Sequence, residues 1–286
     1  MIKIGSEAHK ELFCQSFLHS YQEYEPKQLP WPKLDTEALS LLRGIPFWHE
    51  ALTVELRAGE MVSAFAETID DPLLRESIAL QGKEETRHSR LLDTMMTQYG
   101  IEIDRPQHTI PNDLKTGFID LGHEECLDSF FAFGLFQLAH QARVLPEAMF
   151  AIFEPILDEE ARHIVFFANW MAYMQIQQGQ GAGLIRGAKS LWFYGRAVNR
   201  LISSFSQGSS QNGPGFTVAG ASAFPFKITA ESFLATCLSE NARRMSKFDR
   251  QLLFPELVPT LAKTALQTIK LLPKKQTSSQ QSANLG

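Results

Sequence analysis

The chain has 286 residues, 44% of them hydrophobic and 21% charged, and its formal net charge is −5. This length allows one large hydrophobic core with or without an appended lobe, and the lack of a basic excess argues against a nucleic-acid partner. Three scattered cysteines without a CxxC pair, no signal-like N-terminus and no run of about 18 apolar residues predict a cytoplasmic protein without disulfides, a thiolate zinc site or a membrane span.

The first predicted unit is an N-terminal arm over residues 1–45, where turn-forming residues interrupt a mixed pattern; we expect it to pack on the main body. Helical periodicity then dominates residues 46–180. Prolines favour helix starts and glycines favour helix ends, and their positions divide this region into two helical hairpins in tandem. The four predicted helices cover residues 46–69, 72–99, 117–143 and 147–177.

A helical extension is predicted over residues 181–273. We expect a flexible loop at 206–215, a break in the last helix at Pro259 and a disordered tail at 274–286. The three helices expected in this extension cover residues 184–205, 229–247 and 257–272. The predicted fold class is therefore all-α, a four-helix bundle with an N-terminal arm and additional C-terminal helices.

A short motif occurs twice in the predicted bundle, Glu-Glu-x-Arg-His at residues 84–88 and again at 159–163. A single copy on a helix is most often a solvated ion pair. Counting by helical turns, however, places one glutamate and the histidine of each copy on the apolar stripe of its helix. Two copies with this placement predict a buried polar site that contains Glu85, His88, Glu160 and His163.

The first and third predicted helices supply further carboxylates. Glu55 lies on the apolar stripe of the first helix, and its distance from the turn predicts that it meets Glu85 at one level. The third stripe holds both Glu125 and Asp128. Helix counting favours Asp128 and the longer reach of a glutamate favours Glu125, so both residues are candidates.

Burying this set of carboxylates and imidazoles requires compensating positive charge, because each unpaired buried charge costs several kcal/mol. Two divalent metal ions balance four carboxylates, and Glu-x-x-His on a helix directs two ligands to the same side. An oxygen and nitrogen shell without thiolates favours two iron ions, with manganese as the alternative, over a structural zinc. The predicted metal ligands are Glu55, Glu85, His88, Glu160 and His163, with Glu125 or Asp128.

These motifs resemble those of the ferritin-like di-iron carboxylate superfamily, over about residues 46–178. EETRH is similar to the Glu-Glu-x-Arg-His motif of soluble acyl-carrier-protein desaturases. DEEARH is similar to the Asp-Glu-x-Arg-His motif of multicomponent monooxygenase hydroxylases and ribonucleotide reductase small subunits. The first acid of each copy is Glu here, where Asp is common in those families. The resemblance implies a ferritin-like bundle in which the ligands are supported by Glu84, Arg87, Glu159 and Arg162.

The resemblance also implies an oxidoreductase that activates dioxygen and oxidises an organic, apolar substrate by hydroxylation, desaturation or N-oxygenation. Because the sequence has no glycine-rich dinucleotide loop, a ferredoxin or reductase would supply the electrons. A homodimer is also compatible with this interpretation. Two other functions are alternatives, namely iron or peroxide handling at the same site and a non-catalytic helical interaction protein.

Other conspicuous residues fit structural roles better than catalytic ones. The phenylalanines around the predicted site are expected to pack in the core rather than line a substrate pocket. Cys126 is expected to be a buried apolar side chain, and His123 a capping or surface histidine rather than an extra ligand. Pro155 should kink the fourth helix, with or without opening a path to the metals.

Overall fold

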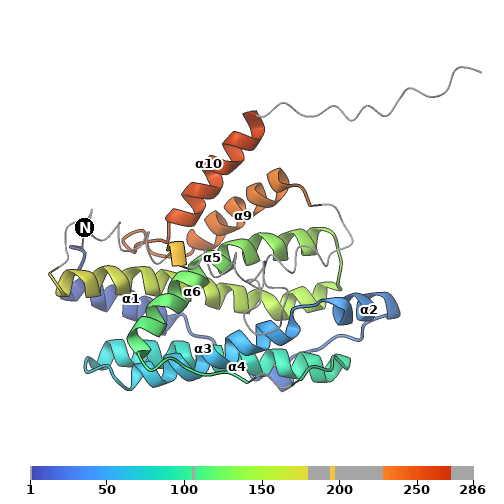
Figure 1. Ribbon diagram of the computed structural model, residues 1–286, viewed down its shortest axis with the longest axis horizontal. Helices are drawn as coiled ribbons and strands as arrows, with labels where there is room; N and C mark the ends of the chain where they lie inside the picture. Colours follow the sequence, from blue (N-terminus) through green and yellow to red (C-terminus); the bar gives the residue numbers. More distant parts are fainter. Residues whose placement is uncertain (1, 105–106, 180–193, 197–227, 272–286) are drawn as a thin grey trace, which may run out of the picture.

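The computed structural model describes residues 2–104, 107–179, 194–196 and 228–271. All regular structure in these residues is helical, which confirms the predicted all-α class. Four long helices, α3 to α6, form the body, and helices from both ends of the chain pack around them (Figure 1). None of the described helices combines the length and the apolar composition that crossing a membrane requires.

The first pair of long helices is α3 (Trp48–Ala66) and α4 (Pro72–Tyr99). Asp71 begins α4, because its side chain accepts hydrogen bonds from two backbone N–H groups of the first turn, both at 3.0 Å. Gly100 ends α4 in the left-handed conformation, with a φ of 61°. The pair forms the predicted hairpin, except that Pro46 lies in the turn before α3 and not at its start.

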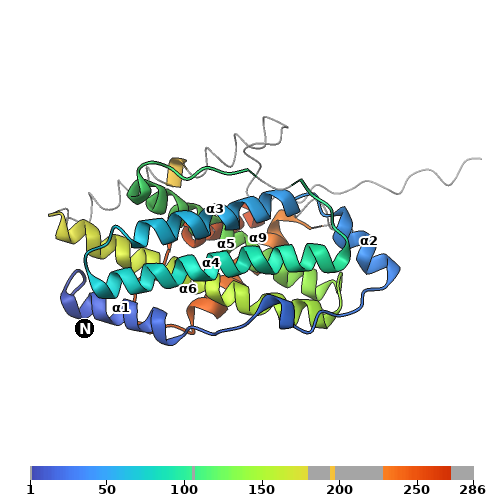
Figure 2. The same ribbon diagram turned by 90° about the horizontal axis from the view of Figure 1, so that it is seen from below.

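The second pair is α5 (Leu114–Gln141) and α6 (Glu147–Gln177). α5 begins before the predicted Gly117, because the Asp113 side chain accepts a hydrogen bond from the backbone N–H of Thr116 at 3.1 Å. The connection between α4 and α5 runs back along the molecule, so these two helices point the same way (Figure 2).

The N-terminal arm contains two helices that the sequence pattern did not reveal. α1 (Glu7–His19) lies against α4 and α6, and α2 (Thr36–Gly44) follows after a short 3-10 helix, η1 (Pro26–Gln28). The His9 side chain in α1 donates a hydrogen bond through Nε2 to Asn169 of α6 at 3.0 Å. The arm is therefore packed against the long helices, as expected.

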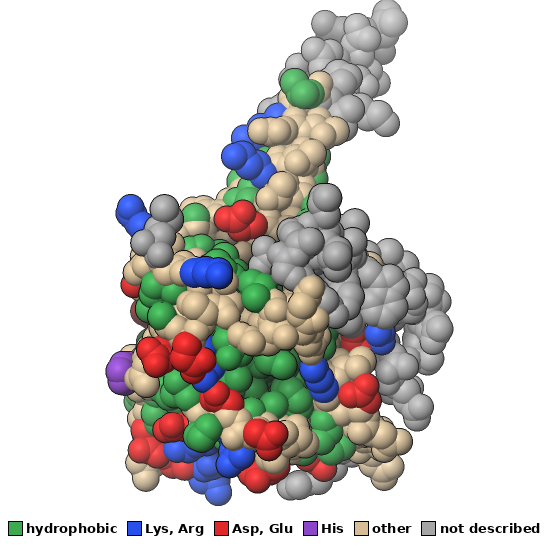
Figure 3. Space-filling view, turned by 90° about the vertical axis from the view of Figure 1, so that its left-hand side faces the viewer, with side chains coloured by type: hydrophobic (Ala, Val, Ile, Leu, Met, Phe, Trp, Pro, Cys, Tyr) green, Lys and Arg blue, Asp and Glu red, His purple; other side chains and the backbone are tan. Residues whose placement is uncertain are grey.

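The C-terminal extension provides α9 (Ala230–Met245), which packs on α5, and α10 (Leu257–Leu271), which packs on α9 and projects from the body (Figure 3). The predicted break at Pro259 is wrong. Pro259 is the third residue of α10, and N–H groups of the first turn have no helical acceptor to lose. Three predictions fall outside the described residues, apart from 194–196: the helix at 184–205, the loop at 206–215 and the tail at 274–286.

The hairpin of α3 and α4 is closely packed because glycines let the two backbones approach. A Cβ atom added to Gly59 would lie 2.5 Å from the side-chain oxygen of Thr86, and one added to Gly82 would lie 2.5 Å from that of Ser63. These reciprocal contacts fix the register of the two helices.

Two large hydrophobic cores and one small apolar cluster lie among the described residues. One surrounds Phe65 of α3 and Ile78 of α4, and the other surrounds Trp48 of α3 and Met95 of α4. The central turns of both helices, which carry the predicted ligands, lie between these cores. Four of the phenylalanines near the motifs are buried in the first core as predicted, namely Phe130, Phe133, Phe166 and Phe167, whereas Phe153 packs against the second core.

Candidate metal centre

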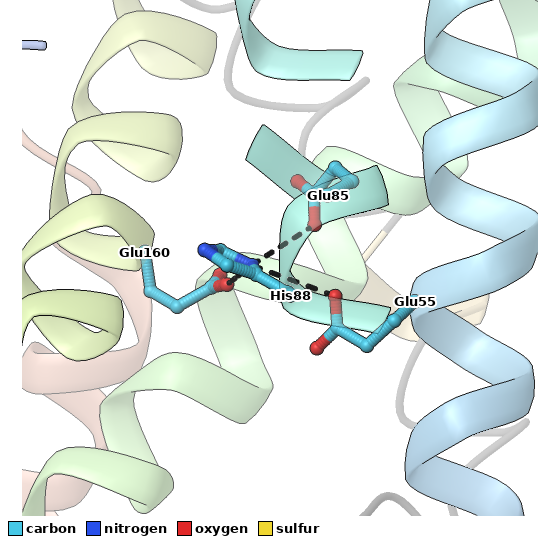
Figure 4. A group of neighbouring side chains, drawn as sticks. All are labelled: Glu55, Glu85, His88 and Glu160. Carbon is cyan, nitrogen blue, oxygen red and sulfur yellow. Dashed lines mark ion pairs between the residues drawn. The ribbon is translucent and has the colours of Figure 1, made fainter. Parts of the chain in front are cut away.

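Two overlapping groups of carboxylates and histidines lie between the four long helices. In each group, one ligand atom from every member lies within 4.8 Å of the others. The first group, whose members come from α3, α4 and α6, is shown in Figure 4. Its members are Glu55, Glu85, His88 and Glu160, and those of the second group are Glu85, Glu125 and His163. Each long helix therefore contributes a possible ligand, and Glu85 belongs to both groups.

His88 directs its Nδ1 atom at three carboxylates. The distances from Nδ1 are 3.2 Å to Glu160, 3.5 Å to Glu55 and 3.6 Å to Glu85. The side chain of His88 is only 2% exposed, whereas those of Glu55 and Glu160 are 23% and 17% exposed. The imidazole is thus sealed in the bundle, and solvent reaches the group on the side of the two glutamates.

His163 has a similar relation to the second group. Its Nδ1 lies 2.9 Å from Oε1 of Glu85 and 3.8 Å from Oε2 of Glu160. The other oxygen of each carboxylate is the one that approaches His88. Glu85 and Glu160 therefore each turn one oxygen toward each histidine, which suits carboxylates that bridge two ions.

The second nitrogen of each ring contacts an acid on the opposite helix. Nε2 of His88 on α4 donates to Glu159 of α6 at 2.7 Å. In the reverse direction, Nε2 of His163 on α6 donates to Glu84 of α4 at 2.9 Å. The residues predicted to support the ligands are thus in contact with them, but each motif copy supports the histidine of the other copy.

Arginines complete these contacts and connect them to the N-terminal arm. Arg87 donates to Glu159 at 2.6 Å, and its guanidinium lies 4.0 Å from the ring centre of Tyr24. The Tyr24 hydroxyl donates to the same carboxylate at 3.4 Å. Arg162 likewise contacts the acid that holds His163, and it donates to the backbone carbonyl of Phe17 at 3.2 Å. The arm therefore holds both arginines from outside.

The carboxylates and imidazoles of the site shift one another's pKa values. Burial would lower the pKa of both imidazoles, but the surrounding carboxylates hold the pKa of His88 and of His163 well above its ordinary value. Burial raises the pKa of Glu55 to about 8 and that of Glu125 well above its ordinary value. Burial also opposes ionisation of Glu85, yet the two histidines hold its pKa well below its ordinary value. Without a metal ion, protons thus supply the positive charge that the carboxylates require.

The donor set fits metal ions. Because each Nε2 donates to a carboxylate, which only accepts, the lone pair of a neutral ring is on Nδ1 and faces further carboxylate oxygens. The Nδ1 atoms of His88 and His163 are buried and make no hydrogen bond to the described residues. Either a proton on Nδ1 or a metal ion between Nδ1 and the carboxylates removes the repulsion of their lone pairs, and the metal ion requires the neutral ring. Carboxylate oxygens with imidazole nitrogens are ligands that suit iron and manganese.

Six of the seven predicted ligand residues belong to the two groups. Asp128 does not, because it lies about one turn beyond Glu125 on α5. Burial, with the charges of Glu124 and Glu160, raises the pKa of Asp128 to about 7. Of the two third-helix candidates, the geometry therefore favours Glu125, whose carboxylate is within reach of Glu85.

Glu55 meets Glu85 as predicted, because their ligand atoms lie within 4.8 Å of each other, but along the helices Glu55 is nearer the level of His88. The glycine contact places Gly59 beside Thr86, and Glu55 lies one turn before Gly59 on α3. The register of the hairpin is set by this contact and not by the position of the turn.

Cys126 and His123 belong to neither group. Burial raises the pKa of the Cys126 thiol to about 12, which agrees with the predicted inert, buried side chain. His123 is not the predicted capping or surface residue. It is buried, donates through Nδ1 to the carbonyl of Ile119 at 2.7 Å, and packs edge-on against Phe167.

A pocket of about 290 Å³ borders the outer side of the site. It lies between α1, α6 and the residues after α9, and α6 continues through Pro155 in its wall. The pocket reaches Glu159 and Arg162 but contacts none of the six grouped residues.

Two residues that contact the site were not predicted. Nε2 of Gln81 lies 3.4 Å from Glu85 and 3.5 Å from Glu125. A polar residue on an otherwise apolar stripe was the available signal for Gln81. For Tyr24, which lies in the arm, the sequence offered no signal.

No protein-family model, curated protein or solved structure matches this chain. The resemblance to di-iron proteins is therefore limited to short motifs. Function is inferred from the geometry and chemistry of the two groups.

Proposed function

We propose that this protein is a non-haem di-iron oxidoreductase with a ferritin-like bundle, which activates dioxygen to oxidise an organic, apolar substrate. The observation that carries this proposal is the pair of overlapping ligand groups that share Glu85, each with a buried histidine Nδ1 aimed at carboxylates. Four long helices with parallel α4 and α5 support the ferritin-like architecture (Figure 1).

The residues of the site would have two roles, binding the ions and orienting the histidines. Glu85 and Glu160 span both histidines, while Glu55 and Glu125 each complete one group. Glu159 and Glu84 fix the ring orientations that present Nδ1. When bound, two iron ions would supply the redox chemistry needed to use dioxygen. A separate ferredoxin or reductase would provide electrons, as the motif resemblance implies.

Substrate approach is most direct on the side of Glu55 and Glu160, whose side chains are partly exposed. The buried histidine side is closed by α1 and by the segment that contains Tyr24. The bundle would thus keep water from the imidazoles while it admits small molecules from the carboxylate side.

Metal content and spectroscopy test the proposal. The purified protein is loaded with ferrous iron without oxygen, then exposed to oxygen and followed by optical and Mössbauer spectroscopy. We expect two irons per chain in a coupled pair, and loss of this pair in Glu85→Ala and Glu160→Ala. The matched control is Glu60→Ala, since Glu60 is exposed and bonds His108 outside the site. A wild-type protein that binds no iron, or a Glu85→Ala variant that binds it equally well, would refute the proposal.

Iron or peroxide handling at the same groups is a second candidate. It is favoured by the pocket beside the site, which contacts none of the grouped residues and so offers no substrate position against them. The same loaded protein separates the two functions. Rapid iron or peroxide turnover that no organic additive changes would favour this second candidate over substrate oxidation.

A further inference from the structure

The two motif copies differ in the residue that lies one helical turn before the second glutamate of the motif. Gln81 precedes Glu85 in the first copy, whereas Ile156 precedes Glu160 in the second. Ile156 packs in a small apolar cluster with Leu91. The pseudo-symmetry of the site is therefore broken at this position by one amide.

The amide of Gln81 lies on the side of the second group. Its Nε2 donates to Oε1 of Glu85 at 3.4 Å and to Oε2 of Glu125 at 3.5 Å. Oε1 of Glu85 is also the oxygen 2.9 Å from His163. In the metal-loaded site both carboxylates are ionised and only accept, so the amide must turn its nitrogen toward them. This leaves its carbonyl oxygen without a donor among the described residues.

That carbonyl oxygen is an unusual feature of a buried site. Gln81 is only 1% exposed, and a buried acceptor without a partner is unfavourable, so most such groups are satisfied. The repeat shows that an apolar side chain fits the equivalent position of the other helix. The amide is therefore not required by the motif itself, and its free acceptor points to a donor that arrives from outside the chain.

We propose that Gln81 makes the two ion positions unequal, holding Glu85 and Glu125 at the His163 position and accepting a hydrogen bond there from an O–H or N–H group of the bound small molecule. This inference rests on the proposed metal function, and it narrows the substrate class to apolar molecules that carry a hydroxyl or amino group. Gln81 is thus a positioning and specificity residue and not a metal ligand.

Cobalt binding tests whether Gln81 makes the two ion positions unequal. Co²⁺ titration of the wild type, followed by its optical bands, should show two unequal steps. Gln81→Met, which keeps the length and loses the amide, should weaken one step by about 10-fold or more and leave the other unchanged. The matched control, Ile156→Met at the equivalent position, should leave both steps unchanged. Gln81→Asn, which keeps an amide but shortens its reach, serves as the second variant if Gln81→Met does not fold.

Two small-molecule probes test whether Gln81 accepts a hydrogen bond from the bound molecule. Hexan-1-ol and its methyl ether share an apolar body, but only the alcohol donates a hydrogen bond. The alcohol should shift the cobalt bands of the wild type more than the ether does, and Gln81→Met should abolish this difference. Equal cobalt steps in the wild type, identical effects of both probes, or a Gln81→Met variant that behaves like the wild type would each overturn the inference. A wild type that binds no cobalt would instead refute the proposed metal function.

Discussion

His88 on α4 is held by Glu159 on α6 through a 2.7 Å hydrogen bond to Nε2. The acid comes from the second motif copy and the histidine from the first, and Glu84 with His163 forms the reverse pair. Each copy therefore orients the histidine of the other. Neither motif copy alone supplies both a histidine and the acid that holds it. This is a physical reason for the motif to occur twice.

Replacing the acid should weaken metal binding without removing a ligand. In Glu159→Gln, the His88 ring loses its charged acceptor and the buried Arg87 loses its 2.6 Å ion pair, although it keeps its hydrogen bond to the carbonyl of Gln22. We expect metal affinity to fall by about 10- to 100-fold, measured by Co²⁺ titration. Asp158→Asn is the control, because the neighbouring Asp158 pairs outward with Arg244 and Lys247. An equal loss in this control would show that the effect is not specific to the ring contact.

The hydroxyl of Tyr24 should contribute less to metal affinity than the Glu159 carboxylate does. Tyr24→Phe removes the 3.4 Å bond to Glu159 but keeps the ring beneath Arg87. We expect the free energy of unfolding to fall by about 1 kcal/mol, and by more in Tyr24→Leu, where the cation–π contact is also lost. Tyr21→Phe is the comparison for metal affinity, since Tyr21 contacts Arg87 and not the acid. Urea unfolding and Co²⁺ titration of the three variants test this order.

The grouped residues on the two motif helices were predictable because their spacing is local. Glu85 with His88, and Glu160 with His163, share a face within one helical turn. A charged pair on an apolar stripe is visible in the sequence, and its repetition separates it from an ordinary surface ion pair. The all-α class and the two hairpins followed from the same periodicity.

Relations between helices were harder to predict. The level of Glu55 depends on the contacts of Gly59 and Gly82, where the missing Cβ atoms let α3 approach α4. The crossed pairing of acids and histidines depends on the rotation of α4 against α6. α1 was missed because its buried face includes His9 and Lys10, so it lacks a clear apolar stripe.

Raising the pH should destabilise the metal-free protein more than the metal-loaded one. The pKa of Glu55 is raised from 4.5 to about 8, and those of His88 and His163 are raised as well. Above the ordinary pKa values, the folded state binds more protons than the unfolded state, so stability falls as the pH rises through the raised values. The lowered pKa values of Glu85 and Glu160 affect stability only in acid and do not oppose this trend.

Thermal unfolding from about pH 6 to about pH 9, with and without Co²⁺, measures this difference. Bound metal ions take the place of the protons, so the loaded protein should lose less stability with rising pH. Glu55→Gln should flatten the curve of the metal-free protein, because it removes one of the titrating groups. Parallel curves with and without metal would contradict the assignment of these protons to the site.

Close packing of α3 on α4 should control both stability and metal binding. In Gly59→Ala, the new Cβ would lie 2.5 Å from the Thr86 hydroxyl and 2.9 Å from its backbone nitrogen, so the helices must move apart. Overpacking costs about 1–3 kcal/mol, which exceeds the gain of up to about 1 kcal/mol from replacing a helical glycine. The same movement would carry Glu55 away from His88, now 3.5 Å from it. Urea unfolding and Co²⁺ titration should therefore both show a loss.

The matched control is Gly44→Ala at the end of α2, where an added Cβ meets no atom within 4 Å. It should leave metal affinity unchanged, because α2 carries no grouped residue. Gly82→Ala should repeat the effect of Gly59→Ala, since its Cβ would lie 2.8 Å from the backbone nitrogen of Ser63. If both α3–α4 variants bind Co²⁺ as tightly as the wild type, the separation of these helices does not set the first ligand group.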